Sequence, residues 1–440
     1  MRLGAGLIVA TLLALSACQT YQRAPLATRA VYARLQVQAS SLAGQKLPPH
    51  PIRAGQALDL STLELLAVCN NPQLRQEAAA HDLAMAQSIA AGYLPDPVYG
   101  YNHDHPQSGP DSLNAHVQSL DIDLASLLGH GLARRASAAQ QRQVDLALLW
   151  QEWQLIAQVR QLAYALRQDE RIAALQEQRY RLLAVLAAQE QEALQRQLLA
   201  RTRWQQDAAA ATVAEQDWLT ARQQVRRDQQ ELVADLGLPA ATVLTLAPLA
   251  SPTLPTTTPD LRRRPDLLAL HAAWESEDLG YRQALLRQFP VLDVGIDQTT
   301  DNTGTSSLGF GFRLPLPVFN GNRPAISIAQ ASRRQIAALY QERLTQGYVQ
   351  VENLRQRIAS AQVQEDLAQT HLQQLDAGLH QGQDLLAEHR LALATYTGMA
   401  VQVTEQRIDR EQRRYWREQQ ELSLMSLLGV VPNWEHPEHD

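Results

Sequence analysis

The strongest constraint on the fold of this chain is an internal repeat. Four short sequence marks occur twice, in the same order, at spacings of 192 to 195 residues. The paired marks are Asn71–Leu74 with Arg264–Leu267, Leu94–Pro95 with Phe289–Pro290, Leu128–Gly131 with Asn320–Arg323, and Leu236–Gly237 with Leu428–Gly429. Such agreement indicates a tandem duplication, so the fold must be built from two copies of one unit.

Each unit is expected to open with a helix and continue into two strands. The helices begin near Pro72 and Pro265 and extend for about 20 residues, because proline suits the first turn of a helix. Two extended segments follow in each unit, separated by polar loops at residues 106–111 and 299–306. The chain therefore predicts four strands, two from each unit.

A long helical hairpin is expected to complete each unit. The chain has neither glycine nor proline between Gly131 and Gly237, and no proline between Pro324 and Pro432. A helix of roughly 65 to 70 residues would be about 100 Å long, which exceeds any globular core, so each stretch must fold back once. Apolar residues recur at three- and four-residue steps, as in a coiled coil. They include Leu146, Leu149, Trp153, Ile156, Leu162 and Leu166.

The predicted strands alternate between apolar and polar residues. In the last of them, residues 307–317, every second residue is apolar, and residues 116–124 and 291–297 alternate likewise with aspartates on the polar side. A soluble sandwich with one hydrated face shows this pattern, but it would need more strands and a less acidic face. A transmembrane barrel shows it with apolar side chains toward lipid and polar ones toward a lumen.

Four strands are too few to close a barrel of useful width. Open sheet edges would leave backbone groups unpaired in lipid. The strands are therefore expected to combine with those of identical copies in a ring-shaped homo-oligomer.

The first residues predict export and a lipid anchor. A short positive start is followed by an apolar run at residues 3–15, which is too short to span a bilayer. Residues 15–18 resemble a bacterial lipobox, in which Cys18 is lipidated and becomes the new N-terminus. An ordinary secretory signal that contains a cysteine is the alternative. Gln19 after the cysteine resembles the default sorting of Gram-negative lipoproteins to the outer membrane.

Charge and motif content exclude several functions. The chain has 39 basic and 45 acidic residues, a net charge of -6, so we expect no nucleic-acid partner. Lys46 is the only lysine, so a phosphate-binding loop or a Schiff-base enzyme would depend on that one residue. The sequence contains no Gly-x-Ser-x-Gly and no His-Glu-x-x-His. We therefore expect a protein that is not an enzyme and needs no cofactor.

The lipoprotein start, the duplicated Asn/Arg-Pro-x-Leu helix openings and the two Leu-Gly ends resemble the TolC family of outer-membrane efflux channels over nearly everything after Leu58. The resemblance implies a mainly α fold with a small β part. In such a homotrimer, twelve strands form one β-barrel in the outer membrane and twelve helices form a periplasmic α-barrel. The implied partners are outer-membrane lipid, a periplasmic adaptor protein and an inner-membrane pump.

Residues 314–323 are similar to the Pro-Leu-Pro-x-Phe-Asn motif of the cobalt–zinc–cadmium branch of that family. This branch passes heavy-metal cations from a pump of the resistance–nodulation–division type. The implied function is passive conduction from the periplasm to the exterior, with heavy-metal cations as the favoured cargo. Organic toxicants or a secreted polypeptide are alternative cargoes. A non-conducting lipid-anchored periplasmic scaffold and the adaptor of such a pump are alternative functions.

The resemblance also suggests roles for individual residues. The candidates for the lumen of the barrel are Asp121, Asp123, Asp293, Asp297 and Arg313. Threefold repetition would turn each aspartate into a ring that attracts cations, although such residues also fit the ordinary polar side of a hydrated strand.

The two hairpin turns are placed near residues 198–202 and near residues 397–400, where only the second contains a glycine. In the family, the periplasmic tip that docks the adaptor lies at these turns. The candidates are Leu199, Ala200, Arg201, Thr202, Arg203, Gly398, Met399, Ala400 and Val401.

Two pairs of histidines are candidate metal ligands, His103 with His105 in an external loop and His436 with His439 near the C-terminal end. Imidazoles at such spacing can bind zinc or copper. Without a third and a fourth ligand at defined spacing they rarely bind tightly.

The expected organisation of the chain follows from these features. It is a signal peptide at 1–17, a lipid-anchored extended segment at 18–58, a first repeat at 59–240, a linker at 241–259, a second repeat at 260–431 and a tail at 432–440.

Overall fold

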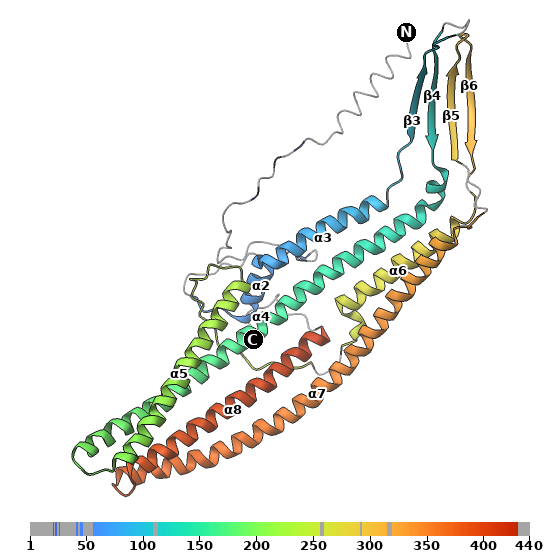
Figure 1. Ribbon diagram of the computed structural model, residues 1–440. Helices are drawn as coiled ribbons and strands as arrows, with labels where there is room; N and C mark the ends of the chain where they lie inside the picture. The colour runs from blue at the N-terminus through green and yellow to red at the C-terminus, as the bar shows by residue number, and fades with distance from the viewer. Residues whose placement is uncertain are drawn as a thin grey trace.

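The computed structural model describes residues 56–108, 113–255, 259–290, 293–314 and 319–429, together with 21, 23, 26, 41–42 and 45–46. The protomer is elongated and mostly helical, with a four-stranded sheet at one end and the turns of two long helical hairpins at the other (Figure 1). Two short strands, β1 (Ser41–Leu42) and β2 (Gln45–Lys46), pair separately. None of the described helices combines the length and the apolar character that a membrane span requires.

The predicted order of elements is present in both repeats. The first contains α2 (Leu60–Asn70), α3 (Pro72–Ala91), β3 (Val98–Asp104), β4 (Ala115–Ile122), α4 (Leu124–Gln195) and α5 (Arg201–Asp235). The second contains η1 (Leu261–Arg263), α6 (Pro265–Leu286), β5 (Asp293–Thr300), β6 (Ser306–Arg313), α7 (Arg323–Ala387) and α8 (Leu393–Leu428). Both opening helices start at the predicted prolines, and the four predicted strands form. Sequence analysis did not anticipate α2, which is a separate helix before α3.

The repeated marks that open and close the first repeat lie at helix ends, where they hold the chain in place. The Asn71 side chain accepts a hydrogen bond of 2.9 Å from the backbone N–H of Leu74 and so caps α3. Its amide donates to the carbonyl of Asp235 at 2.9 Å, which ties the start of α3 to the end of α5. Gly237 follows with a φ of 62°, a left-handed conformation that glycine adopts without strain. Both ends of the repeat are thus fixed together.

Helix α4 is the central element of the protomer. It has 72 residues, which corresponds to roughly 108 Å, and it contacts α3, α5, α6 and α8. Helix α7 packs on α6 and α8, so α4 joins the two repeats. The main apolar core lies where α2 and the end of α5 cover α4. Its most deeply buried members are Leu63, Leu66, Val159, Leu166, Leu232 and Leu236.

Two predicted boundaries were wrong in the first repeat. The long helix begins at Leu124 and not after Gly131, so Gly129 and Gly131 lie inside α4. The preceding strand ends at Ile122 and not at Leu124. The cause is Asp123, whose carboxylate caps α4 and starts the helix directly after the strand.

Candidate functional site

The sheet has one apolar face and one acidic face. Its strands are antiparallel in the order β3-β4-β5-β6. The register aligns Leu120, Ile296 and Phe310 in one row, and the large apolar side chains beside them are exposed in the protomer. We call this the apolar face. Its members include Tyr99, Leu120, Ile122, Val294, Ile296, Leu308, Phe310 and Phe312.

The opposite face, which we call the acidic face, carries three of the predicted aspartates. The register places Asp121 beside Gly295, Asp297 beside Gly309, and Asp293 opposite Arg313. Because side chains alternate along a strand, these residues share one side of the sheet. Four of the five predicted lumen candidates, Asp121, Asp293, Asp297 and Arg313, therefore lie together.

Glycines on the acidic face make room for the carboxylates. A Cβ added to Gly295 would lie 2.6 Å from Asp121 Oδ1, and one added to Gly309 would lie 2.6 Å from both carboxylate oxygens of Asp297. The two carboxylates thus lie flat over the backbone of the neighbouring strand. As a result, the acidic face is a shallow charged wall.

A hollow of about 560 Å³ lies at the helix-proximal end of this face. Its charged lining residues are Asp96, Asp121, Asp123, Asp293, Asp297 and Arg313. Five carboxyl groups therefore surround one guanidinium, which gives a negative region. Sequence analysis missed Asp96, because it precedes β3 and lies outside the alternating pattern. Asp96 directly follows Leu94-Pro95, one of the repeated marks, and this position could have identified it as a candidate.

Asp123 differs from the prediction. It is not a strand residue, because it caps α4 and accepts a hydrogen bond of 2.9 Å from the backbone N–H of Ser126. Its side chain still lines the hollow. A substitution at Asp123 would consequently change both the start of α4 and the local charge.

The histidine pair of the first loop lies at the end of β3. His103 pairs in register with His116 and its ring stacks with Tyr101 at 6.4 Å between centroids. His105 Nδ1 lies 2.6 Å from the side-chain oxygen of Asn114. In the part of the chain that the structure describes, no three histidine, cysteine or acidic side chains are grouped as a metal site. His436 and His439 lie outside the described residues, as does Cys18.

The two hairpin turns lie together at the end opposite the sheet (Figure 1). The first joins α4 and α5 through residues 196–200, close to the predicted position. Leu199 and Ala200 are in this turn, whereas Arg201, Thr202 and Arg203 form the first turn of α5.

The prediction of the second turn was wrong. It consists of residues 388–392, and Gly398, Met399, Ala400 and Val401 lie inside α8. A single glycine is tolerated within a helix, so it was a poor marker. The duplication was a better marker of the turn, because Leu199-Ala200 returns as Leu391-Ala392 at the spacing of the repeat.

One arginine holds three helices together near these turns. Arg179 of α4 lies 2.8 Å from a carboxylate oxygen of Asp217 in α5 and 3.3 Å from one of Glu405 in α8. Its side chain is mostly buried, with 18% exposed. It links the two hairpins, one from each repeat, so separating them would require breaking its ion pairs.

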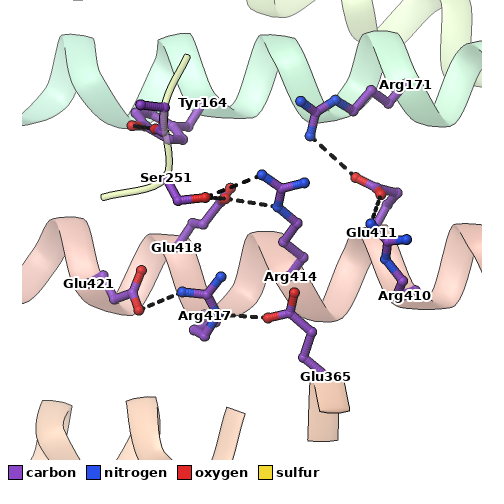
Figure 2. A network of polar contacts seen from close by, with 11 residues as sticks. Tyr164, Arg171, Ser251, Glu365, Arg410, Glu411, Arg414, Arg417, Glu418 and Glu421 are labelled. Atoms are coloured by element: carbon purple, nitrogen blue, oxygen red, sulfur yellow. Dashed lines mark hydrogen bonds and ion pairs between the residues drawn. The ribbon is translucent and has the colours of Figure 1, made fainter. Parts of the chain in front are cut away.

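Farther from the turns, a second polar network joins α4, α7 and α8 (Figure 2). Arg171 of α4 reaches Glu411 of α8 at 3.3 Å, and Arg417 of α8 reaches Glu365 of α7 at 2.7 Å. Arg414 binds Glu418 at 3.0 Å within α8. Of these three pairs, Arg171–Glu411 joins the first hairpin to the second, and the other two lie within the second hairpin.

No protein-family model matches the sequence, and no curated protein matches it. The structure, by contrast, is similar to solved bacterial membrane proteins. A membrane protein from Pseudomonas aeruginosa gives a TM-score of 0.72 at 18% identity, over 93% of this chain and 99% of that chain. The outer-membrane channel OprN gives 0.71 at 15% identity, over 95% and 100%. CusC, described as undergoing transmembrane channel formation, gives 0.68 at 17% identity, over 84% and 91%.

These likenesses show the fold. The mainly α, TolC-like architecture with a small sheet at one end, which the family resemblance implied, is confirmed. Of these proteins, OprN is an outer-membrane channel and CusC forms a transmembrane channel.

Proposed function

We propose that this chain is a TolC-family protomer of a homotrimeric outer-membrane channel, the exit component of a tripartite efflux system. The observation that carries the proposal is the two-faced sheet at the end of two long hairpins. Its apolar face suits lipid, and its acidic face suits a water-filled lumen. Substrate passes through passively, and an inner-membrane pump supplies the free energy.

The state of the sheet edges supports assembly from several copies. Strands β3 and β6 are the outer strands of the four-stranded sheet, and each has one side without a neighbour in the described protomer. Such edges are costly in lipid because their N–H and C=O groups would be unpaired. Three copies would supply twelve strands and close the barrel.

Heavy-metal cations are the cargo we favour. Threefold repetition would convert Asp121, Asp293 and Asp297 into nine carboxylates opposed by three guanidiniums from Arg313. A surplus of negative charge concentrates cations and repels anions. The similarity of residues 314–323 to the motif of the heavy-metal branch supports the same cargo.

The ends of the protomer support the remaining assignments. The turns at 196–200 and 388–392 would form the periplasmic tip that docks an adaptor protein. Cys18 would carry the lipid anchor in the outer membrane, with the repeats divided at 59–240 and 260–431. These assignments rest on the sequence pattern and on the shared fold.

Planar-bilayer recording on the purified full chain tests the proposal. We expect discrete conductance steps and a reversal potential that favours cations over anions. Asp293→Asn and Asp297→Asn should each weaken this preference, whereas Asp82→Asn, on an exposed part of α3, should not.

Two other outcomes have distinct meanings. Conductance without cation preference would keep the channel and contradict the metal cargo in favour of organic compounds. Silence in the unmodified chain and in every variant that loosens the contact between the hairpins, Arg179→Gln among them, would overturn conduction and favour a scaffold.

A further inference from the structure

The α4–α5 hairpin packs acidic side chains against each other. The Asp169 carboxyl of α4 lies beside that of Asp228 in α5, and the Glu190 carboxyl lies beside that of Asp207 nearer the turn. Within each helix the two positions are three heptads apart, so both pairs lie along one seam of the coiled coil. Two acidic side chains therefore face each other at two places along this seam.

The equivalent hairpin of the second repeat is built differently. There Asp376 of α7 faces Arg407 of α8 at 2.9 Å, and Glu365 of α7 faces Arg417 of α8 at 2.7 Å. Opposite charges hold that seam at any pH at which carboxyl groups are ionised. The two copies of one ancestral unit have thus acquired different electrostatics.

A hydrogen bond between two carboxyl groups requires a proton. An ionised carboxylate only accepts hydrogen bonds, so two ionised groups would repel at this distance. Asp228 is 6% exposed, and its Oδ1 accepts a hydrogen bond of 2.7 Å from the Gln224 amide. Its Oδ2 is buried and accepts no hydrogen bond from an amide, hydroxyl or guanidinium group of the described residues. A buried carboxylate in such surroundings is costly unless the pair keeps a proton.

Three cations of these helices are engaged elsewhere. On α4, Arg171 pairs with Glu411 of α8, and on α8, Arg414 pairs with Glu418 (Figure 2). On α5, the Arg222 guanidinium lies over the Trp218 ring at 5.1 Å. No arginine in the described structure is paired with Asp169 or Asp228.

The remaining titratable neighbour from α8 is Tyr415. Burial, and then the charges of Asp169 and Asp228, raise the pKa of its hydroxyl to about 12, so it stays neutral. Burial first, and then the hydrogen bond and charge of Asp228, raise the pKa of Asp169 to about 7.

The pair nearer the turn is a contrasting case. Arg203 lies 2.9 Å from Asp207 and 3.5 Å from Glu190, so a guanidinium balances that pair. Burial raises the pKa of Glu190 and Arg203 opposes the rise. Asp169 and Asp228 have no such guanidinium among the described residues, so this is the pair that a bound proton stabilises more.

We propose that Asp169 and Asp228 form a proton-binding site that clamps α5 against α4. The site goes beyond conduction and does not depend on the cargo. In the packed hairpin the pair retains a proton that it would release if the helices separated. The seam is therefore tight below neutral pH and loosens as the pH rises through neutrality. Because α5 leads to the turn at 196–200, the proton sets how firmly that turn is held.

Infrared difference spectroscopy on the full chain in detergent, between about pH 5.5 and about pH 8.5, tests the site directly. We expect the absorption of a protonated carboxyl group to disappear in the unmodified protein at the higher pH. Asp169→Asn and Asp228→Asn should each remove the part of this change that comes from the pair, and the part that remains is that of Glu152, whose pKa burial also raises to about 7. Asp376→Asn, which removes an acid from the other hairpin, should leave it intact. A change that is as large in both variants as in the unmodified protein would overturn the proposal.

Hydrogen–deuterium exchange provides the mechanical readout. Corrected for intrinsic rates, exchange of α4 and α5 amides around the pair should accelerate about tenfold over the same pH range. The side-chain amide of either asparagine supplies an N–H donor in place of the proton. The backbone amides around the pair should therefore exchange slowly in both variants over the whole pH range. Exchange that does not change with pH in the unmodified protein would contradict the clamp. If one asparagine variant does not assemble, the other carries the same test.

Discussion

Gln197 and His389 adopt the same left-handed backbone conformation, with φ values of 62° and 58°, at matching positions of the two hairpin turns. Their separation equals the spacing of the duplication. In both turns a leucine and an alanine follow before the next helix starts. The two turns are therefore copies of one structure that is built without glycine.

Replacing either residue with glycine should stabilise its turn. A side chain in the left-handed region costs about 1–2 kcal/mol, and the greater freedom of glycine in the unfolded chain offsets part of the gain. For Gln197→Gly and His389→Gly we expect about 0.5–1 kcal/mol each. Thermal unfolding of the purified protein at a fixed scan rate measures the change.

The matched control is Gly398→Ala inside α8. Nothing lies within 4 Å of a Cβ at this position. Alanine should therefore be tolerated and should stabilise the helix by about 0.5–1 kcal/mol. A marked loss of stability on this substitution would mean that the chain turns at Gly398 after all.

Two glycines of β6 should respond differently to the same substitution. Gly309→Ala would force the Asp297 carboxylate away from the wall, because the new Cβ would lie 2.6 Å from both oxygens. In an assembled barrel this should change single-channel conductance measurably, whereas Gly311→Ala meets nothing within 4 Å and should not. Equal effects of the two variants would show that Asp297 does not face the conduction path.

Much of this fold was readable from the sequence, because a duplication repeats each signal. Pro72 and Pro265 each mark the start of a helix, and the alternation at Leu308–Phe312 correctly predicted a two-faced strand. The placement of Asp121, Asp293, Asp297 and Arg313 on one face of the sheet followed from the alternation of apolar and polar residues in their strands.

The errors have local physical causes. Asp123 looked like one more polar strand residue, but a carboxylate before a helix is also an N-cap. Gly398 looked like a turn, but the turn lies at His389, where an ordinary residue takes a left-handed conformation. The acid pair at Asp169 and Asp228 joins two helices, so only the register of the hairpin brings it together.

Removing the guanidinium of Arg179 should loosen the contact between the two hairpins on the side of their turns. Arg179→Gln leaves Asp217 and Glu405 without their shared cation, while the helices keep their apolar contacts. We expect a higher open probability in bilayer recordings with little loss of thermal stability. Arg181→Gln is the control, because Arg181 is 72% exposed and pairs only along α4 in the described structure. An unchanged open probability in Arg179→Gln would show that this residue does not hold the channel closed.

The glycines that end the two repeats occupy equivalent positions but should differ in their tolerance to alanine. Gly237 has a φ of 62°, and an added Cβ would lie 2.4 Å from the backbone oxygen of Asn70. Gly429 has a φ of 72°, and its nearest neighbour would be a side-chain atom of Arg264 at 3.9 Å. Gly429→Ala should therefore cost only the left-handed strain, about 1–2 kcal/mol. Gly237→Ala adds a backbone clash where α2, α3 and α5 meet, so it should lower the apparent Tm clearly more. Equal losses in the two variants would mean that the start of α3 is not held against the end of α5 in solution.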